Sequence, residues 1–175
     1  QANTLLSHIE QVLEMGELEN FGKLNKKRIN LHELVAGCIE NSIWQKKQEE
    51  IFILYLNAIN PVICADEFHA NNLILNLIDN AIKYSKANST VSINSTLLGT
   101  KLVCKVQDEG IGIKKEDLDN LFNHFFRSDA LNHKNIPGNG LGLSIAKKAA
   151  DAIHAEIHAE SELGVGTTFT IHFLS

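Results

Sequence analysis

The segment at residues 66–85 constrains the fold most, because it carries two stripes of different character at helical spacing. The wider stripe is apolar, which predicts a long helix that packs against a sheet or another helix. It consists of Leu73, Ile74, Leu77, Ile78, Ala81 and Ile82. The narrower stripe consists of Asn76, Asn80, Lys83 and Tyr84. We expect Asp66 to cap this helix.

Asn76 and Asn80 lie one turn apart on the narrower stripe, although asparagine is a poor interior helix residue. Solvent exposure explains such a pair on its own. A carboxamide oxygen is also a hard neutral ligand that suits Mg²⁺, whose other ligands are usually waters and phosphate oxygens. The pair therefore indicates a Mg²⁺ site only in combination with the other motifs of the chain.

The other segments alternate helices with strands. Helices are predicted over residues 4–18, 31–48, 114–124 and 144–153. Strands are predicted over residues 27–30, 51–57, 62–65, 90–97, 101–108, 155–161 and 167–174, with a hairpin at 90–108. Residues 127–139 are polar, contain Pro137 and Gly138, and are predicted to form a loop. This order predicts a two-layer α/β sandwich, in which a mixed, mostly antiparallel sheet packs on helices.

Composition narrows the possible functions. The chain has 16 basic and 21 acidic residues and a formal charge of −5, which argues against a nucleic-acid partner. No apolar run approaches the ~20 residues that cross a bilayer. Cys38, Cys64 and Cys104 are far apart, so we expect three buried, reduced thiols. His154 and His158 have helical i, i+4 spacing but no accompanying third ligand, which does not favour a metal–imidazole site.

Two glycine-rich segments have the composition of nucleotide-binding loops. Residues 108–113 (DEGIGI) follow a strand, and Asp108 can accept a hydrogen bond from an exocyclic amine while the glycines let backbone approach a flat ring. A plain strand-to-helix turn explains this segment equally well on its own. Residues 138–144 (GNGLGLS) open a helix and can present N–H groups to phosphate oxygens. They match neither a P-loop nor a Rossmann fingerprint.

A phenylalanine-rich segment, residues 121–127 (LFNHFFR), ends at the start of the predicted loop. Arg127 lies at the start of this loop, where it could reach a γ-phosphate. Packing in the core would by itself explain the phenylalanines. The turn at residues 164–169 (GVGTTF) indicates little by itself. Each of these signals is weak or moderate alone, but their order and spacing together are highly specific.

In that order, five segments resemble the sequence boxes of sensor histidine kinases. Residues 76–85 (NLIDNAIKYS) resemble the N box, and residues 121–127 resemble the phenylalanine box. Residues 108–113, 138–143 and 164–169 resemble the first, second and terminal glycine boxes. The resemblance covers about residues 30–175. It implies the Bergerat ATP-binding fold, which gyrase, the Hsp90 chaperones and the MutL repair ATPases share.

The resemblance also implies two cofactors, ATP and Mg²⁺, and a set of residues that hold them. Asn80 is the expected Mg²⁺ ligand, Asp108 is expected to hold the adenine amino group, and residues 127–139 become the ATP lid. The implied catalytic residues are Asn76, Asn80, Lys83 and Arg127. The implied nucleotide-binding residues are Asn76, Asn80, Lys83, Tyr84, Asp108, Gly110, Gly112, Ile113, Phe122, Phe125, Arg127, Gly138, Gly140, Leu141, Gly142, Leu143 and Thr167.

A kinase of this family transfers the ATP γ-phosphoryl to a histidine on a dimeric helical hairpin, and then to an aspartate of a response regulator. No histidine here lies in the expected His-Glu/Asp-x-Arg/Lys-x-Pro context, and we expect His8 and His32 to be helix-surface residues. The chain is therefore expected to bind Mg-ATP without phosphorylating itself. We interpret residues 1–22 as the C-terminal part of the second hairpin helix, and residues 23–175 as the catalytic domain.

The expected partners follow from the same resemblance. They are the phosphoacceptor hairpin and the receiver domain of a response regulator. Because the hairpin is the usual dimer interface, we expect a homodimeric parent protein and a fragment that is a monomer or a weak dimer. The parent is expected to be anchored in the bacterial inner membrane, with this domain in the cytoplasm.

Three other functions compete with this interpretation. The helical segment before residue 30 and the phenylalanine box argue against a serine kinase of the anti-sigma-factor type. A gyrase- or chaperone-type ATPase normally carries a water-activating glutamate at the position of Asn76. Intact Asn80, Asp108 and glycine boxes argue against a non-enzymatic scaffold.

Overall fold

The computed structural model describes Gly16 and residues 24–46, 51–86, 88–128 and 138–174, which form two sheets and the helices that cover them. The larger sheet has the strand order β2-β4-β5-β7-β6. Its strands are β2 (Ile51–Leu56), β4 (Thr90–Leu98), β5 (Lys101–Asp108), β6 (Ala155–Glu162) and β7 (Gly166–Phe173). Strand β2 runs parallel to β4, and the other neighbours are antiparallel. In the smaller sheet, β1 (Lys26–Asn30) pairs antiparallel with β3 (Val62–Asp66).

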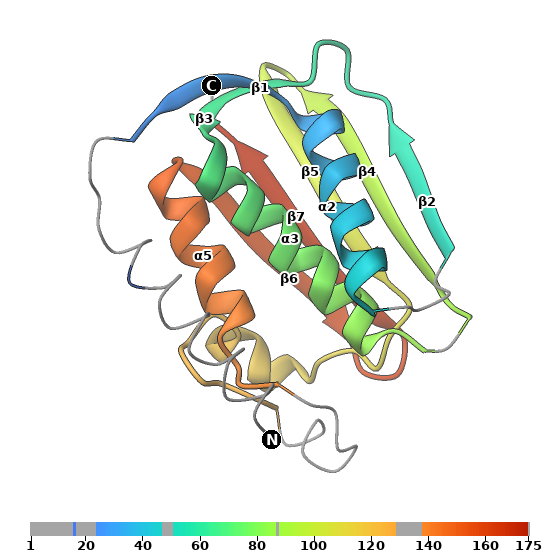
Figure 1. The fold of residues 1–175 in the computed structure, drawn as a ribbon. Helices are drawn as coiled ribbons and strands as arrows, with labels where there is room; N and C mark the ends of the chain where they lie inside the picture. The colour runs from blue at the N-terminus through green and yellow to red at the C-terminus, as the bar shows by residue number, and fades with distance from the viewer. Residues whose placement is uncertain (1–15, 17–23, 47–50, 87, 129–137, 175) are drawn as a thin grey trace.

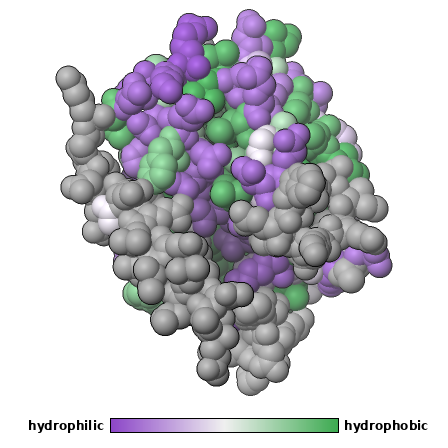
Figure 2. Space-filling model, in the orientation of Figure 1, coloured by the Kyte–Doolittle hydropathy of each residue, from purple (hydrophilic) through white to green (hydrophobic). Residues whose placement is uncertain are grey.

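Three helices cover one face of the larger sheet (Figure 1). They are α2 (Leu31–Lys46), α3 (Glu67–Tyr84) and α5 (Gly142–Ala152), and α3 lies between the other two. The predicted two-layer α/β sandwich with a mixed, mostly antiparallel sheet is confirmed. Hydrophilic residues dominate the described part of the face seen in Figure 2, with hydrophobic residues scattered between them.

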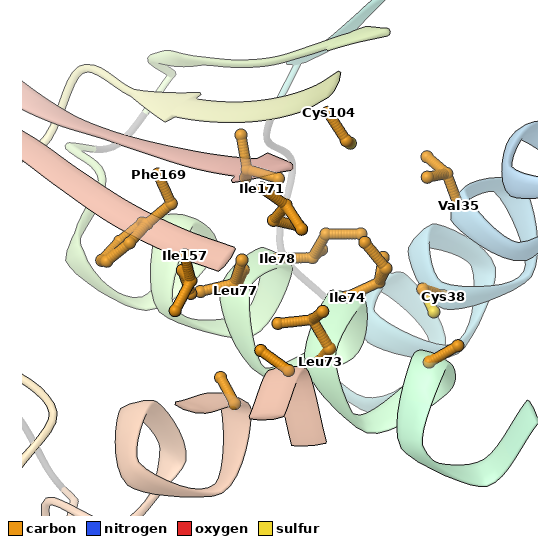
Figure 3. Close-up of a cluster of buried hydrophobic side chains, with 14 of the residues drawn as sticks. Val35, Cys38, Leu73, Ile74, Leu77, Ile78, Cys104, Ile157, Phe169 and Ile171 are labelled. Atoms are coloured by element: carbon orange, nitrogen blue, oxygen red, sulfur yellow. The ribbon is translucent and has the colours of Figure 1, made fainter. Parts of the chain in front are cut away.

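The apolar stripe of α3 forms the centre of the core, as its spacing predicts. Leu73, Ile74, Leu77 and Ile78 are fully buried. Their side chains point from α3 into the core that it shares with α2, α5 and the inner face of the sheet (Figure 3). The neighbours labelled there are Val35, Cys38, Cys104, Ile157, Phe169 and Ile171. Burying a Leu or Ile side chain stabilises a fold by about 1.5–3 kcal/mol, so this contact fixes which way the polar stripe of α3 faces.

Two local predictions are confirmed at the ends of elements. Asp66 is the N-cap of α3, and its Oδ1 accepts hydrogen bonds from the N–H groups of Phe68 (3.1 Å) and His69 (3.4 Å). Strands β4 and β5 form the predicted hairpin, with Gly99 at a φ of 63° in the turn. Each feature depends on neighbours in sequence, which is why the sequence alone could predict it.

Two predictions were wrong. The helix expected over residues 114–124 is a short 3₁₀-helix, η1 (Lys115–Asn120), followed by turns. The N–H of Leu121 bonds to the carbonyl three residues earlier, and Phe125 has a φ of 60°, so an α-helix does not continue. Cys64 is exposed, whereas Cys38 and Cys104 are buried as expected, because side chains alternate between the two faces of β3.

The other predicted elements agree with the structure to within a few residues. The strands expected at 51–57 and 62–65 are present, but β2 and β3 belong to different sheets. Apart from Gly16, the helix predicted at 4–18 lies outside the described residues, as does most of the loop predicted at 127–139.

Candidate functional site

The polar stripe of α3 faces the start of α5. A Cβ placed on Gly142, the first residue of α5, would lie 3.1 Å from Asn76 Oδ1 and 3.8 Å from the amide atoms of Asn80. Asn76 donates its Nδ2–H to the Asn72 carbonyl at 2.9 Å, which leaves its Oδ1 directed toward α5. The two carboxamides predicted from sequence therefore lie together beside a helix N-terminus.

The N-terminus of α5 is arranged to attract an anion. Its N-cap is Leu141, which gives no side-chain cap to the first N–H groups of the helix. The Ser144 hydroxyl donates to the Leu141 carbonyl at 2.8 Å and so does not cap them either. Uncapped N–H groups and the helix dipole together favour negative charge at this position. The phosphate contact expected of residues 138–144 remains a prediction, and the uncapped N–H groups of α5 are in place to make it.

Two cationic side chains meet the same glycine segment at Gly138. The Arg127 guanidinium donates from Nη1 to the Gly138 carbonyl. A Cβ placed on Gly138 would overlap the Lys83 ammonium, so these groups are in close proximity. Lys83 Nζ also lies 5.0 Å from the centre of the Tyr84 ring. Burial raises the pKa of the Tyr84 hydroxyl, and the nearby Arg127 charge opposes that shift.

Asp108 forms the other end of the site, where β5 ends. It is 5% exposed, and its Oδ1 accepts hydrogen bonds from the N–H groups of Gly110 (2.8 Å) and Thr167 (3.3 Å). Burial raises the pKa of the carboxyl to about 6, although those two N–H groups lower it. Since both hydrogen bonds use Oδ1, Oδ2 can accept one from an amine of a ligand.

The loop after Asp108 is wedged between two other segments. The N–H of Ile111 donates to the Tyr84 carbonyl at 3.2 Å, and the Ile111 carbonyl accepts from the Gly164 N–H at 2.7 Å. Gly112 has a φ of 67°, and a Cβ there would overlap the Glu162 carbonyl. A side chain at residue 112 would therefore meet both strain and a steric clash. This close packing gives the loop a fixed shape beside Asp108.

The remaining predicted residues are either packed against the protein or exposed. Gly140, with a φ of 74°, packs on the backbone of residues 125–126. Leu141 is 1% exposed, and the partly buried residues Ile113, Phe122 and Leu143 pack on the core. Phe125 is 67% exposed. A nucleotide contact for these residues remains a prediction.

Two serines near the site make contacts that the sequence did not predict. The Ser161 hydroxyl accepts from Ile113 N–H, and lies within hydrogen-bonding distance of the Gly166 carbonyl and Thr167 Oγ1, all at 2.8 Å. The Ser128 hydroxyl donates to Asp117 Oδ2 at 2.6 Å. Inward alternation along β6 could have placed Ser161 on the core face, but nothing in the sequence signals its partners.

The described residues fit a divalent cation that takes most of its ligands from a nucleotide. Among them, no group of three or more His, Cys, Asp or Glu side chains could hold a metal ion. The Asn80 Nδ2 is buried and lacks a hydrogen-bond partner among those residues, so this amide group has a donor left to bind a ligand oxygen. A carboxamide beside an anion site suits Mg²⁺, which keeps water and phosphate ligands.

The helices described are too short or too polar to cross a membrane.

The fold defines the class: a two-layer α/β domain of the Bergerat type, in which the candidate residues lie along α3, at the start of α5 and at the end of β5. Residues 65–175 match the family described as histidine kinase-, DNA gyrase B- and HSP90-like ATPases. The chain belongs to this family, and the residues matched are its ATP-binding domain.

Individual relatives agree with this assignment. The sensor protein RprX of Bacteroides fragilis is 38% identical over 175 residues, which cover 98% of this chain and 34% of RprX. The Acinetobacter baumannii histidine kinase AdeS superposes with a TM-score of 0.73 at 26% identity, over 97% of this chain and 78% of that one. Full-length ShkA in complex with AMPPNP gives a TM-score of 0.81 at 24% identity, over 97% of this chain and 35% of ShkA. The chain spans only about a third of the length of curated relatives such as RprX.

Proposed function

We propose that this chain is the ATP-binding catalytic domain of a two-component sensor histidine kinase. It transfers the γ-phosphoryl group of Mg-ATP to a histidine outside this chain, from which the group passes to an aspartate of a response regulator. The observation that carries the proposal is the convergence of Asn76, Asn80, Lys83 and Arg127 on residues 138–142 at the start of α5. Resemblance to RprX and AdeS supports the kinase class.

The chemistry left to this chain is positioning and charge neutralisation. The N–H groups of α5 and the cations Lys83 and Arg127 would bind the phosphate chain and stabilise charge on it. Asp108 would accept a hydrogen bond from the adenine amine, which orients the nucleotide from its other end. The AMPPNP complex of ShkA, which has the same fold, is consistent with this use of the site.

Phosphoryl transfer fits the site better than hydrolysis does. Asn76 replaces the carboxylate that would activate a water molecule. The neighbouring carboxylate of α3, Asp79, accepts a hydrogen bond from Ser42 of α2 at 2.7 Å and so faces the other helix. Without a carboxylate at residue 76 to activate water, the γ-phosphoryl group would be preserved until a histidine arrives.

Asn80 would hold Mg²⁺ through Oδ1, since its carboxamide lies beside Gly142 at the start of α5, where phosphate is proposed to bind. The cation would neutralise the phosphate charge during transfer. Substituting a carboxylate at residue 80 would change both the charge and the ligand strength at that position, while keeping nearly the same shape.

The phosphate acceptor is proposed to lie in a helical hairpin to which residues 1–22 contribute the end of the second helix. His32 is a poor candidate, because its Nε2 is engaged with Ser95 Oγ at 2.7 Å. Residues 23–175 would then be the catalytic domain. The response regulator's receiver domain is the downstream partner.

The hairpin also sets the expected assembly and location. It would make the parent protein a homodimer, while this chain alone would be a monomer or a weak dimer. We place the domain in the cytoplasm, in a protein anchored in the bacterial inner membrane.

The proposal is tested by phosphoryl transfer in trans. The chain is mixed with radiolabelled Mg-ATP and a purified histidine-bearing hairpin domain from a sensor kinase. We expect acid-labile label on the hairpin, none on this chain, and loss of transfer in Asn80→Asp. Stoichiometric acid-labile phosphate on this chain alone, or release of free phosphate as the main product, would contradict the proposal.

A further inference from the structure

The side chains of Asp117 and Ser128 form a short hydrogen bond close to the proposed phosphate-binding site. Ser128 Oγ donates to Asp117 Oδ2 at 2.6 Å, and Ser128 is only 8% exposed. The bond joins η1 to the residue directly after Arg127, across eleven positions of sequence. Hydrogen bonds to a carboxylate are stronger than neutral ones, so this contact is a firm attachment.

The bond fixes the backbone on one side of Arg127, and a second bond fixes the other side. The N–H of Phe126 donates to the Asn123 carbonyl at 3.2 Å, which closes the turn before the arginine. Arg127 thus lies between two anchored residues, and its guanidinium reaches the Gly138 carbonyl next to Lys83. A long side chain on an anchored backbone samples fewer positions, so less entropy is lost when it binds an anion.

We propose that Asp117 and Ser128 are a positioning pair that holds Arg127 toward the terminal phosphate of ATP, and thereby sets the preference of the site for ATP over ADP. This inference rests on the proposed function. Neither side chain touches the nucleotide. The pair acts through Arg127, so its removal weakens binding of the triphosphate while leaving contacts to the adenine and the inner phosphates.

The test measures affinities for a non-hydrolysable ATP analogue and for ADP by calorimetry. We expect Ser128→Ala and Asp117→Ala each to weaken analogue binding by about three- to tenfold, the worth of one hydrogen bond. ADP affinity should change less than twofold. Asp117→Asn keeps an acceptor oxygen and should retain most of the affinity. Asp119→Ala, an exposed acid on the same 3₁₀-helix, is the matched control and should change neither value.

A combined substitution separates positioning from a general structural role. If the pair acts through Arg127, then Ser128→Ala adds no further loss in an Arg127→Ala background. An equal loss for ADP and analogue, or an additive loss on top of Arg127→Ala, would overturn the inference. Failure of the unmodified chain to bind either nucleotide would instead overturn the proposed function. Thermal unfolding of each variant confirms that a folded protein was titrated.

Discussion

The two ends of the site are built by different means. At the end of β5, backbone groups fix the structure. Two N–H groups donate to Asp108, and the following loop packs against the Tyr84 and Glu162 carbonyls. At the start of α5, polar side chains and uncapped N–H groups of the helix lie together, and Asn80 has a buried amide nitrogen without a partner among the described residues. The Asp108 end is held by contacts within the protein, whereas we propose that a ligand completes the α5 end.

This difference predicts how substitutions divide. Changes at the Asp108 end should lower the stability of the fold, because they disturb contacts that exist without nucleotide. Changes at the α5 end should lower activity and leave the fold stable, because few contacts there depend on them. Each of the following predictions tests one side of that division.

The largest effect is expected for Gly112→Ala. The new Cβ would overlap the Glu162 carbonyl at a φ of 67°, so the loop must move. We expect a loss of about 3 kcal/mol or more in the free energy of unfolding, measured in urea. Gly164→Ala is the control: its φ is 85° but its Cβ meets nothing within 4 Å, so about 1 kcal/mol of strain is expected. Equal losses in the two variants would show that the loop is not tightly packed.

Asn80→Asp is expected to have the next largest effect, on activity alone. A carboxylate there alters the charge where phosphate and Mg²⁺ are proposed to bind, so phosphoryl transfer to a hairpin domain should fall about a hundredfold. The free energy of unfolding should stay within about 0.5 kcal/mol. Transfer at the unmodified rate, or a large loss of stability, would break the contrast between the two ends.

A smaller effect is expected in the pH dependence of stability. The pKa of Asp108 is raised from 3.8 to about 6, so the folded state binds this proton more tightly than the unfolded state. The contribution of Asp108 to stability is therefore largest below about pH 4 and falls as the pH rises to about 6. Between these values, the unmodified protein should lose about 2 kcal/mol relative to Asp108→Asn.

Urea unfolding at several pH values measures that difference directly. Glu156→Gln, which removes an exposed charge from β6, controls for the change in net charge. A gap between the unmodified protein and Asp108→Asn that does not change with pH would show that Asp108 is not protonated more readily in the fold.

The smallest effect is expected for Ser161→Ala. Its hydroxyl joins the loop after Asp108 to β7, so removal should lower the free energy of unfolding by about 1.5 kcal/mol. Ser92→Ala is the control, because it removes a hydroxyl from a partly buried position of β4. Thermal unfolding compares the two. Identical melting temperatures would show that this end is not stabilised by the hydroxyl.

The sequence predicted those parts of the molecule that depend on local spacing. The spacing of the two stripes of α3 predicted its buried face and placed Asn76 and Asn80 on the same side of the helix. The residues next to Asp66 predicted that it caps the helix. Periodicity in one helix is enough to place side chains on a face.

Contacts between distant segments could not be predicted in this way. The pairs Asp117–Ser128 and Ser161–Ile113 join residues eleven and 48 positions apart, and no motif marks them. The α-helix predicted after Lys114 was wrong, because a 3₁₀-helix over Lys115–Asn120 and the turns after it take its place. Tertiary packing decided these features, and propensity alone does not contain it.

The most direct test of the account is a calorimetric titration of the chain with a non-hydrolysable ATP analogue, with and without Mg²⁺. The account predicts saturable one-to-one binding that is tighter with Mg²⁺ and that Asp108→Ala removes. Absence of binding in a sample shown to be folded, or binding unaffected by Asp108→Ala, would contradict the assignment of the site between α3, α5 and the end of β5.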